Sequence, residues 1–128
     1  MSKIMGHGVD LVECARIQEL GDRYGQRFLS RIFTQSELDY SLPRARKWEH
    51  LAGRFAAKEA ILKAIGTGWR GKIAWTDMEI ANDDVGRPTV RLEGHTQTLA
   101  RQLGITEILI SITHTKDHAV ASAIAVKD

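Results

Sequence analysis

The feature that most constrains this chain is an alanine-rich segment that stops abruptly at glycines. Residues 54–68 read RFAAKEAILKAIGTG, and helical spacing continues upstream, with apolar residues at Trp48, Leu51, Ala52, Phe55 and Leu62. Pro43 suits a first helical turn, and Gly66 and Gly68 suit a C-terminal cap. We therefore predict a helix from about residue 43 to 65 as the centre of the fold.

The remaining segments predict strands and short helices around it. Residues 3–12 alternate as a strand does, residues 76–92 indicate two strands around a turn, and residues 107–126 indicate a hairpin. Helical patterns occur at 14–20, 25–32 and 95–103, and TQSE at 34–37 has the form of a capping box. This order predicts one α+β domain over residues 1–128, with the long helix packed on a mainly antiparallel sheet.

Composition excludes several classes of protein. The chain has 128 residues, of which 43% are hydrophobic, so it can form a core and is not expected to be disordered. Cys14 is the single cysteine, so no internal disulfide can form, which suits a reducing cytoplasm. We see neither a secretion signal nor an apolar run of the roughly 18 residues that a membrane span needs. We therefore expect a cytoplasmic protein without a membrane partner.

The net charge of +2 is unevenly distributed. Residues 44–72 carry eight basic and two acidic side chains. This segment is a candidate site for an anion, although a solvated basic helix face would explain the charges equally well.

Two carboxylates occupy apolar settings. Glu59 falls beside the apolar stripe of the long helix, and Asp10 lies within the strand sequence GVDLVE. An unpaired buried carboxylate is costly, so Glu59 needs an ion pair, with Arg54 or Lys63, or a bound cation. Asp10 could equally be a turn residue at the end of its strand. Taken together, they suggest a Mg²⁺ site completed by water and phosphate oxygens.

A third motif, SITHT at residues 111–115, ends a predicted strand. Its His114 and Thr115 would offer an imidazole, a hydroxyl and backbone N–H groups to an anion, although ordinary turn chemistry accounts for the motif on its own.

The motifs GVDLVE, AGRFAAKEAILKAIGTG and SITHT, in this order, resemble the holo-acyl-carrier-protein synthases, the short bacterial type of 4′-phosphopantetheinyl transferase. The resemblance spans roughly residues 4–126. It implies the fold of that family and transfer of 4′-phosphopantetheine from coenzyme A to a serine of apo acyl carrier protein, with release of adenosine 3′,5′-bisphosphate. It also implies a role in fatty acid biosynthesis and a homotrimer with active sites between subunits.

The resemblance assigns roles to individual residues. Asp10 and Glu59 would hold Mg²⁺, and Lys63, one helical turn after Glu59, would contact the phosphates, assisted by Lys58. The resemblance gives no role to Glu13, which falls on the opposite strand face from Asp10 and is expected to be a second-layer or structural residue. Either Glu59 or a metal-bound water could serve as the general base. The 3′-phosphate and pyrophosphate ends of coenzyme A would meet Arg46, Arg54, His114 and Thr115, with the backbone near Gly66 approaching the nucleotide.

The first helices carry a candidate docking surface for the acidic carrier protein. Its members are Arg16, Leu20, Arg23, Arg27, Phe28 and Arg31. A solvated amphipathic face is the simpler explanation, and the resemblance favours docking. The last strand also alternates bulky residues with alanines, so its smooth face could accept either a helix or another subunit.

Three other functions compete with this assignment. A sequence pI of 8.9 could indicate nucleic-acid binding, but the basic segment lacks interleaved aromatic residues, so we expect none. A Mg²⁺-dependent nuclease or phosphatase could use the same carboxylates. A non-catalytic scaffold that binds carrier protein is the third alternative.

Overall fold

Each predicted helix and strand has a counterpart in the structure, a computed structural model that describes residues 2–67 and 71–128. The elements are β1 (Lys3–Glu13), α1 (Cys14–Tyr24), α2 (Gln26–Ile32), α3 (Gln35–Ser41), α4 (Lys47–Ile65), a 3₁₀ turn (Trp75–Asp77), β2 (Met78–Asn82), β3 (Pro88–Leu92), α5 (Gly94–Gln102), β4 (Glu107–His114) and β5 (His118–Lys127). The α+β prediction is confirmed.

The predicted start of the long helix is wrong by four residues. Helix α4 begins at Lys47, after Arg46, and not at Pro43. Helix α3 instead runs to Ser41, and the N–H of its C-cap residue Leu42 donates to the carbonyl of Leu38. Pro43 therefore follows the end of α3, where a proline prevents the helix from continuing. The capping box predicted at Thr34 and Glu37 is present.

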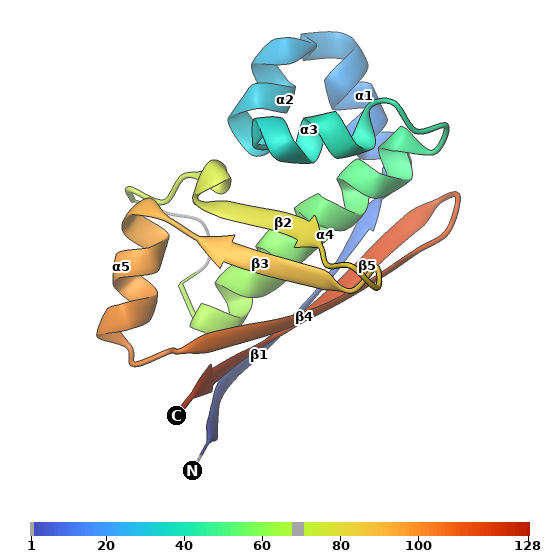
Figure 1. The fold of residues 1–128 in the computed structure, drawn as a ribbon. Helices are drawn as coiled ribbons and strands as arrows, with labels where there is room; N and C mark the ends of the chain where they lie inside the picture. The colour runs from blue at the N-terminus through green and yellow to red at the C-terminus, as the bar shows by residue number, and fades with distance from the viewer. Residues whose placement is uncertain (1, 68–70) are drawn as a thin grey trace.

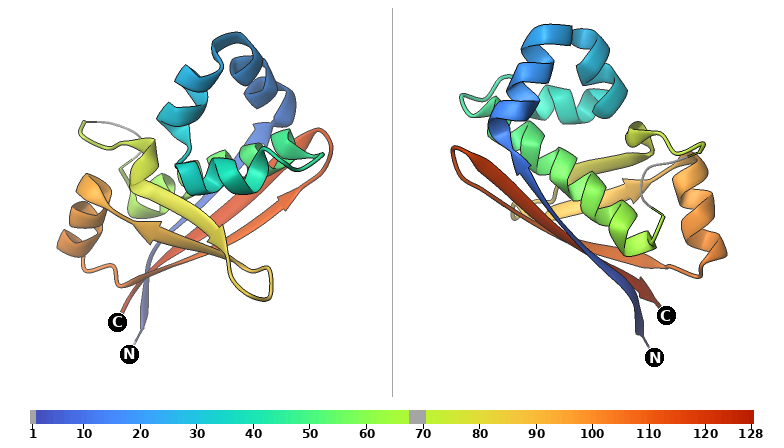
Figure 2. Two further views of the ribbon diagram at one scale, coloured as in Figure 1. Left: turned by 45° about the horizontal axis from the view of Figure 1, so that its top comes forward. Right: turned by 180° about the vertical axis from the view of Figure 1, so that it is seen from behind.

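Helix α4 lies between two antiparallel sheets. One has the strand order β1-β5-β4, and the other is the β2–β3 hairpin. Figure 1 shows α4 running diagonally between the larger sheet and this hairpin, and the right-hand view of Figure 2 shows it from behind, running alongside β1. The termini emerge side by side because Lys3 pairs with Lys127 at the ends of β1 and β5.

One face of the larger sheet is covered by α4, and the other face is exposed. The alanine face of β5 is almost fully buried beneath α4, at Ala119, Ala121, Ala123 and Ala125. Small side chains allow the helix to approach closely, so this face accepts the helix and is not free for another subunit. The opposite face has no covering element among the described residues, and Val9, Leu11 and Leu109 are 49%, 63% and 49% exposed there.

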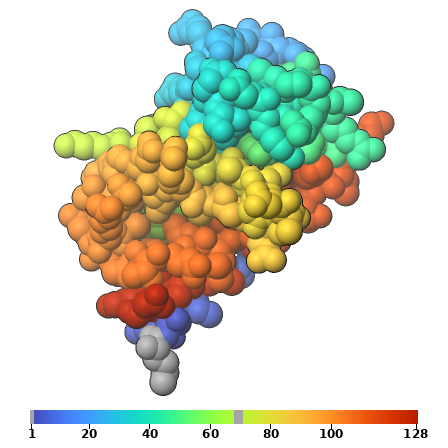
Figure 3. Space-filling view, viewed as in Figure 1, coloured from blue at the N-terminus to red at the C-terminus, as the bar shows by residue number. Residues whose placement is uncertain are grey.

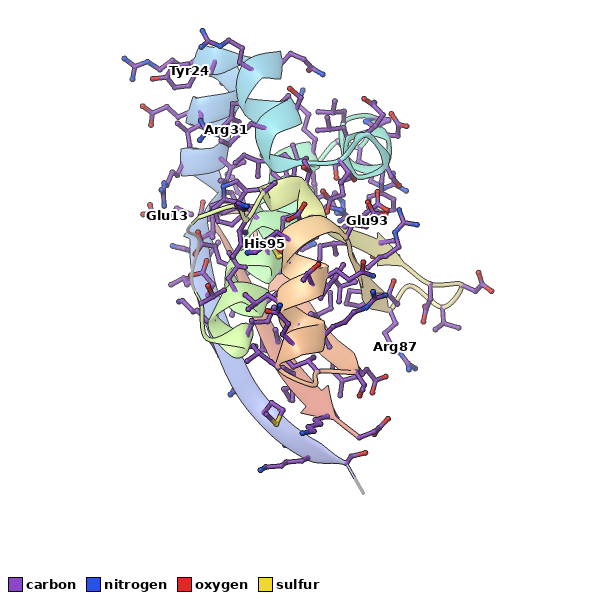
Figure 4. The ribbon with its side chains drawn as sticks, turned by 90° about the vertical axis from the view of Figure 1, so that its left-hand side faces the viewer. Glu13, Tyr24, Arg31, Arg87, Glu93 and His95 are labelled. Atoms are coloured by element: carbon purple, nitrogen blue, oxygen red, sulfur yellow. The ribbon has the colours of Figure 1, made fainter. Side chains whose placement is uncertain are left out.

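Helices α1, α2 and α3 gather at one end of the molecule, around the N-terminal half of α4 (Figures 1 and 3). Figure 4 shows Glu13 at the base of this group, where β1 passes into α1, and Arg31 within it. In the part of the chain that the structure describes, no helix is both long and apolar enough to cross a membrane.

A buried ion pair joins α3 to α4. The Lys58 Nζ donates to Glu37 Oε1 at 2.6 Å and to the carbonyl of Ile32 at 2.7 Å, and both charged side chains are fully buried. The other carboxylate oxygen of Glu37 accepts from the backbone N–H of Ile80 at 2.8 Å. Burial lowers the pKa of Lys58 from its ordinary value, and the charge of Glu37 opposes that shift. This network fixes α3 and β2 on α4.

We expect Lys58→Met to lower the free energy of unfolding by about 3–5 kcal/mol, because it leaves the Glu37 carboxylate buried without its cation. Urea unfolding would measure the change. The double variant Glu37→Gln/Lys58→Met should recover a large part of the loss, and Lys72→Met, at an exposed position, should change little. Equal stability of the Lys58 and Lys72 variants would contradict this role for the ion pair.

Candidate functional site

Strand β1 approaches α4 unusually closely because glycines face the helix. A Cβ atom added at Gly8 would lie 2.1 Å from the carbonyl oxygen of Ala60 and 2.7 Å from the Cβ of Lys63. A Cβ at Gly6 would lie 1.9 Å from the carbonyl oxygen of Ala64. Only glycine fits at these distances. The approach brings Asp10, two residues after Gly8 and on the same strand face, against the helix.

Asp10, Glu59 and Lys63 form the first cluster of candidate residues. The Lys63 Nζ donates to Asp10 Oδ1 at 3.2 Å and to the carbonyl oxygen of Val9 at 2.9 Å. Burial, followed by the charge of Asp10, raises the pKa of Glu59 above its ordinary value, while Lys63 and Arg16 oppose the rise. Lys63, one of the two ion-pair partners considered for Glu59, therefore pairs with Asp10 instead. Glu59 itself has no side-chain hydrogen bond or ion pair within residues 2–67 and 71–128.

This cluster fits a hard divalent cation. Asp10 and Glu59 are half-buried carboxylates from different elements, and each raises the energy of the other's charge, which a cation would offset. No group of three or more His, Cys, Asp or Glu side chains in the described residues could hold a metal by itself. The remaining ligands would have to come from water or substrate, as is usual for Mg²⁺.

A second cluster surrounds a pocket of about 250 Å³ near the N-terminal half of α4. Its lining residues are Tyr40, His50, Gly53, Arg54, Asn82, Gly86, Pro88, Ile112 and His114. Arg54 is 4% exposed, and its Nε has no hydrogen-bond partner in the described structure. Its guanidinium lies 4.4 Å from the ring centroid of Tyr40. Burial lowers the pKa of Arg54, yet an arginine stays protonated in proteins. The pocket wall therefore carries a cation that has no ion-pair partner among residues 2–67 and 71–128.

His114 is held at the edge of this pocket by Glu49. The His114 Nδ1 lies 2.9 Å from Glu49 Oε1, and Arg46 Nε lies 4.0 Å from Glu49 Oε2. The ring of His50 packs edge-on against both His114 and Tyr40, at centroid distances of 5.3 and 5.6 Å. The second cluster thus combines two imidazoles, two guanidinium groups and an aromatic wall, which suits a phosphate attached to a ring.

The two clusters lie on different sides of α4. Arg54 and Glu59, five residues apart, project about 140° apart around the helix. Glu49 and Lys63, fourteen residues apart, are separated by about 20 Å along its axis. The structure therefore brings Asp10, Glu59 and Lys63 together, and separately Arg46, Arg54 and His114.

The other predicted site residues are placed as follows. Lys58 is paired with Glu37 and has no exposed surface, so the structure does not support its predicted contact with phosphate. Thr115 is exposed in the β4–β5 turn and donates its N–H to the carbonyl of His118. Gly66 ends α4 at φ 90°, and its N–H donates to the carbonyls of Leu62 and Lys63. The predicted role of Gly68 lies outside the described residues.

Glu13 ends β1, and the candidate docking residues lie on α1 and α2, which follow it. Glu13 is exposed, and its odd spacing from Asp10 places it on the opposite strand face. The four arginines Arg16, Arg23, Arg27 and Arg31 are exposed on α1 and α2, with Leu20 and Phe28 half-buried between them. Because Arg16 influences the pKa of Glu59, this surface begins beside the carboxylates.

Sequence reasoning missed three residues of the second cluster. Glu49, His50 and Tyr40 contact His114, Arg46 or Arg54, but each has an ordinary place on an amphipathic helix. The basic charge of residues 44–72 and the SITHT motif pointed toward this region but not to these three residues.

Comparison with known proteins identifies the family of this chain. The model of the 4′-phosphopantetheinyl transferase superfamily matches residues 6–123. The holo-acyl-carrier-protein synthase of Solibacter usitatus is 49% identical over 121 residues, which cover 94% of this chain and 97% of that protein. The crystal structure of the Neisseria meningitidis enzyme of the same name has a TM-score of 0.88 and 34% identity, covering 96% of this chain and 98% of that one.

A Bacillus anthracis holo-acyl-carrier-protein synthase, solved in complex with CoA (3′,5′-ADP), has a TM-score of 0.79 and 33% identity and covers 98% of both chains. Identity of this extent over nearly the whole length establishes the relationship. The chain belongs to the 4′-phosphopantetheinyl transferase superfamily and, within it, to the holo-acyl-carrier-protein synthases.

Proposed function

We propose that this chain transfers 4′-phosphopantetheine from coenzyme A to a serine of apo acyl carrier protein and releases adenosine 3′,5′-bisphosphate. The observation that carries this proposal is the cluster of Asp10, Glu59 and Lys63, assembled by the close contact of β1 with α4 in a member of this family. The modified carrier would serve fatty acid biosynthesis, and we infer a cytoplasmic location for the reaction.

The chemistry asks mainly for alignment and charge stabilisation. The serine oxygen forms a bond to the β-phosphorus of the coenzyme A pyrophosphate, and the bond from that phosphorus to the bridging oxygen breaks. Asp10 and Glu59 would hold a Mg²⁺ ion, which neutralises charge on the phosphate oxygens when bound. Lys63, now hydrogen-bonded to Asp10, would donate to an oxygen of the same pyrophosphate. The serine proton would leave to Glu59 or to water.

The nucleotide end of coenzyme A would occupy the second cluster. Arg54 is a buried cation with an unsatisfied N–H, which an anionic oxygen of the 3′-phosphate would satisfy. His114 and Arg46 would add donors from the rim of the pocket, and Tyr40 and Pro88 would flank the adenosine.

We propose that a second copy of the chain completes each active site. The two clusters point away from each other on one chain, so a single coenzyme A would join Asp10 and Glu59 of one copy to Arg54 and His114 of another. The outer face of the larger sheet supports a homotrimer, because Val9, Leu11 and Leu109 form an exposed apolar surface there.

We expect Leu11→Lys to convert the trimer to monomer and to remove most transferase activity, because a charge is placed on the apolar face that would be buried between copies. Light scattering after size-exclusion chromatography would measure the mass. Lys72→Met serves as the exposed control. A monomeric wild-type protein with full activity would exclude shared sites.

We expect charge reversal at Arg16 or Arg27 to raise the KM for carrier protein while leaving the affinity for coenzyme A unchanged. Both side chains are exposed on the helical end, and an acidic partner would be attracted most strongly at low salt. Carrier titrations at low and high salt would separate the variants from wild type mainly at low salt. Arg101→Glu on α5 is the matched control, and equal KM values for all proteins would place docking elsewhere.

The proposed function is tested by incubating the protein with apo carrier, coenzyme A and Mg²⁺ and measuring the carrier mass. Transfer adds phosphopantetheine to the carrier, whereas a hydrolase would release it free in solution. A carrier that binds without gaining mass would indicate the non-catalytic scaffold.

A further inference from the structure

Glu49 is a carboxylate in a place that should repel the proposed ligand. Its side chain is 13% exposed and lies beside the pocket that contains Arg54 and His114. A negative charge next to a phosphate-binding pocket weakens the binding of phosphate unless the carboxylate does something that outweighs the repulsion.

The two oxygens of Glu49 face two residues of that pocket's rim. Oε1 lies 2.9 Å from the Nδ1 of His114, which comes from the end of β4, and Oε2 lies 4.0 Å from the Nε of Arg46, which caps α4. The first distance is that of a good hydrogen bond, and the second is a looser ion pair. Glu49 therefore connects two donors that belong to distant parts of the sequence.

The contact with His114 determines which ring nitrogen carries the proton. An ionised carboxylate can only accept, so Nδ1 must be protonated in this hydrogen bond. The second ring nitrogen, Nε2, is then left for the pocket, and a ring protonated at both nitrogens donates through Nε2 to an anion while Nδ1 stays bonded to Glu49. Packing of His50 against the ring supports the same orientation.

We propose that Glu49 is a positioning residue for coenzyme A binding, which orients His114 and selects the Nδ1-protonated ring. This inference rests on the proposed function, because it assumes that the phosphate end of coenzyme A occupies the pocket. Removing the negative charge of Glu49 should therefore weaken the binding of an anion, although simple electrostatics predicts the opposite.

The test compares wild type with Glu49→Ala, His114→Ala and the double variant, using calorimetric titration with coenzyme A. We expect Glu49→Ala to bind about tenfold more weakly, the scale of one hydrogen bond to a charged group. The double variant should bind within about twofold of His114→Ala, because Glu49 acts through His114. Glu107→Ala, at the opposite end of β4, removes the same charge and should leave the affinity unchanged.

A second measurement is independent of the ligand. ¹⁵N NMR of histidine in the full chain should show His114 protonated at Nδ1 in wild type and in Glu49→Gln, whose amide oxygen can still accept. Glu49→Ala should lose this fixed tautomer, which a purely structural role would not require. If Glu49→Ala fails to fold, Glu49→Gln still tests the inference, because loss of the Nδ1-protonated ring in that variant would contradict it.

The outcomes separate two failures. Wild-type protein that binds no coenzyme A would refute the proposed function itself. Wild-type binding together with equal or tighter binding by Glu49→Ala, additive losses in the double variant, or an unchanged tautomer would overturn the role of Glu49 alone.

Discussion

Glu59→Ala is expected to lower turnover by about 10²–10⁴-fold while the protein remains folded. Stabilisation of transition-state charge by a bound metal contributes several kcal/mol, and each 1.36 kcal/mol corresponds to tenfold in rate. Asp10→Ala should have a similar effect, because both carboxylates would hold the same ion. Steady-state assays with saturating coenzyme A and carrier would measure the change.

The same substitution should leave stability unchanged or increase it. Burial and the charge of Asp10 already raise the pKa of Glu59, and the described structure offers this carboxylate no hydrogen bond in return. Removing the Glu59 carboxylate eliminates the cost of burying its charge and the repulsion between that charge and Asp10. Thermal unfolding would test this, with Glu107→Gln as an exposed carboxylate control. Wild-type turnover that persists in excess chelator would contradict the metal assignment.

Lys63→Met is expected to lower turnover by roughly 10²-fold or more, the scale seen when one preorganised charge-stabilising donor is lost. Methionine keeps most of the length of the side chain and removes only the ammonium. Because the ammonium opposes charge that builds during transfer, the affinity for coenzyme A should fall much less than turnover does. Single-turnover kinetics together with equilibrium titration would separate the two quantities.

A structural explanation for Lys63 makes a different prediction. The residue lies in the last turn of α4, where a cation favours the helix dipole by less than about 1 kcal/mol, and its Nζ also donates to the carbonyl of Val9. On that account, Lys63→Met would keep near-normal turnover and show a slightly lower melting temperature. That pair of results would reduce Lys63 to a residue that joins the helix end to β1.

The predictable part of the fold came from local patterns. Strand β1, the capping box before α3, the β2–β3 and β4–β5 hairpins, and the glycine end of α4 follow from periodicity and turn chemistry within short windows. The start of α4 could not be predicted in this way, because a proline such as Pro43 suits both the first turn of a helix and the position after a helix end. That choice depended on how far α3 extends, which its contacts with α4 and β2 help to decide.

The first cluster could be predicted by residue, and the second only in part. Glu59 and Lys63 share a helix face by spacing alone, and Asp10 stood out as an acid in an apolar strand. Arg54 and Lys58 are both cations on the same helix, and nothing in their local sequence indicates which of them forms a buried ion pair and which faces a pocket. The structure pairs Lys58 with Glu37 in the core and leaves Arg54 facing a pocket.

The sequence by itself determined the order of elements, the family motifs and the identity of the two carboxylates and the lysine beside them. These depend on backbone periodicity, which acts over a few residues. Tertiary structure alone decided that alanines of β5 face α4, that Glu49 holds His114, and that the two clusters lie on different sides of one helix. Those facts depend on which distant segments pack together, and the free energy of packing is set by contacts between elements and not within them.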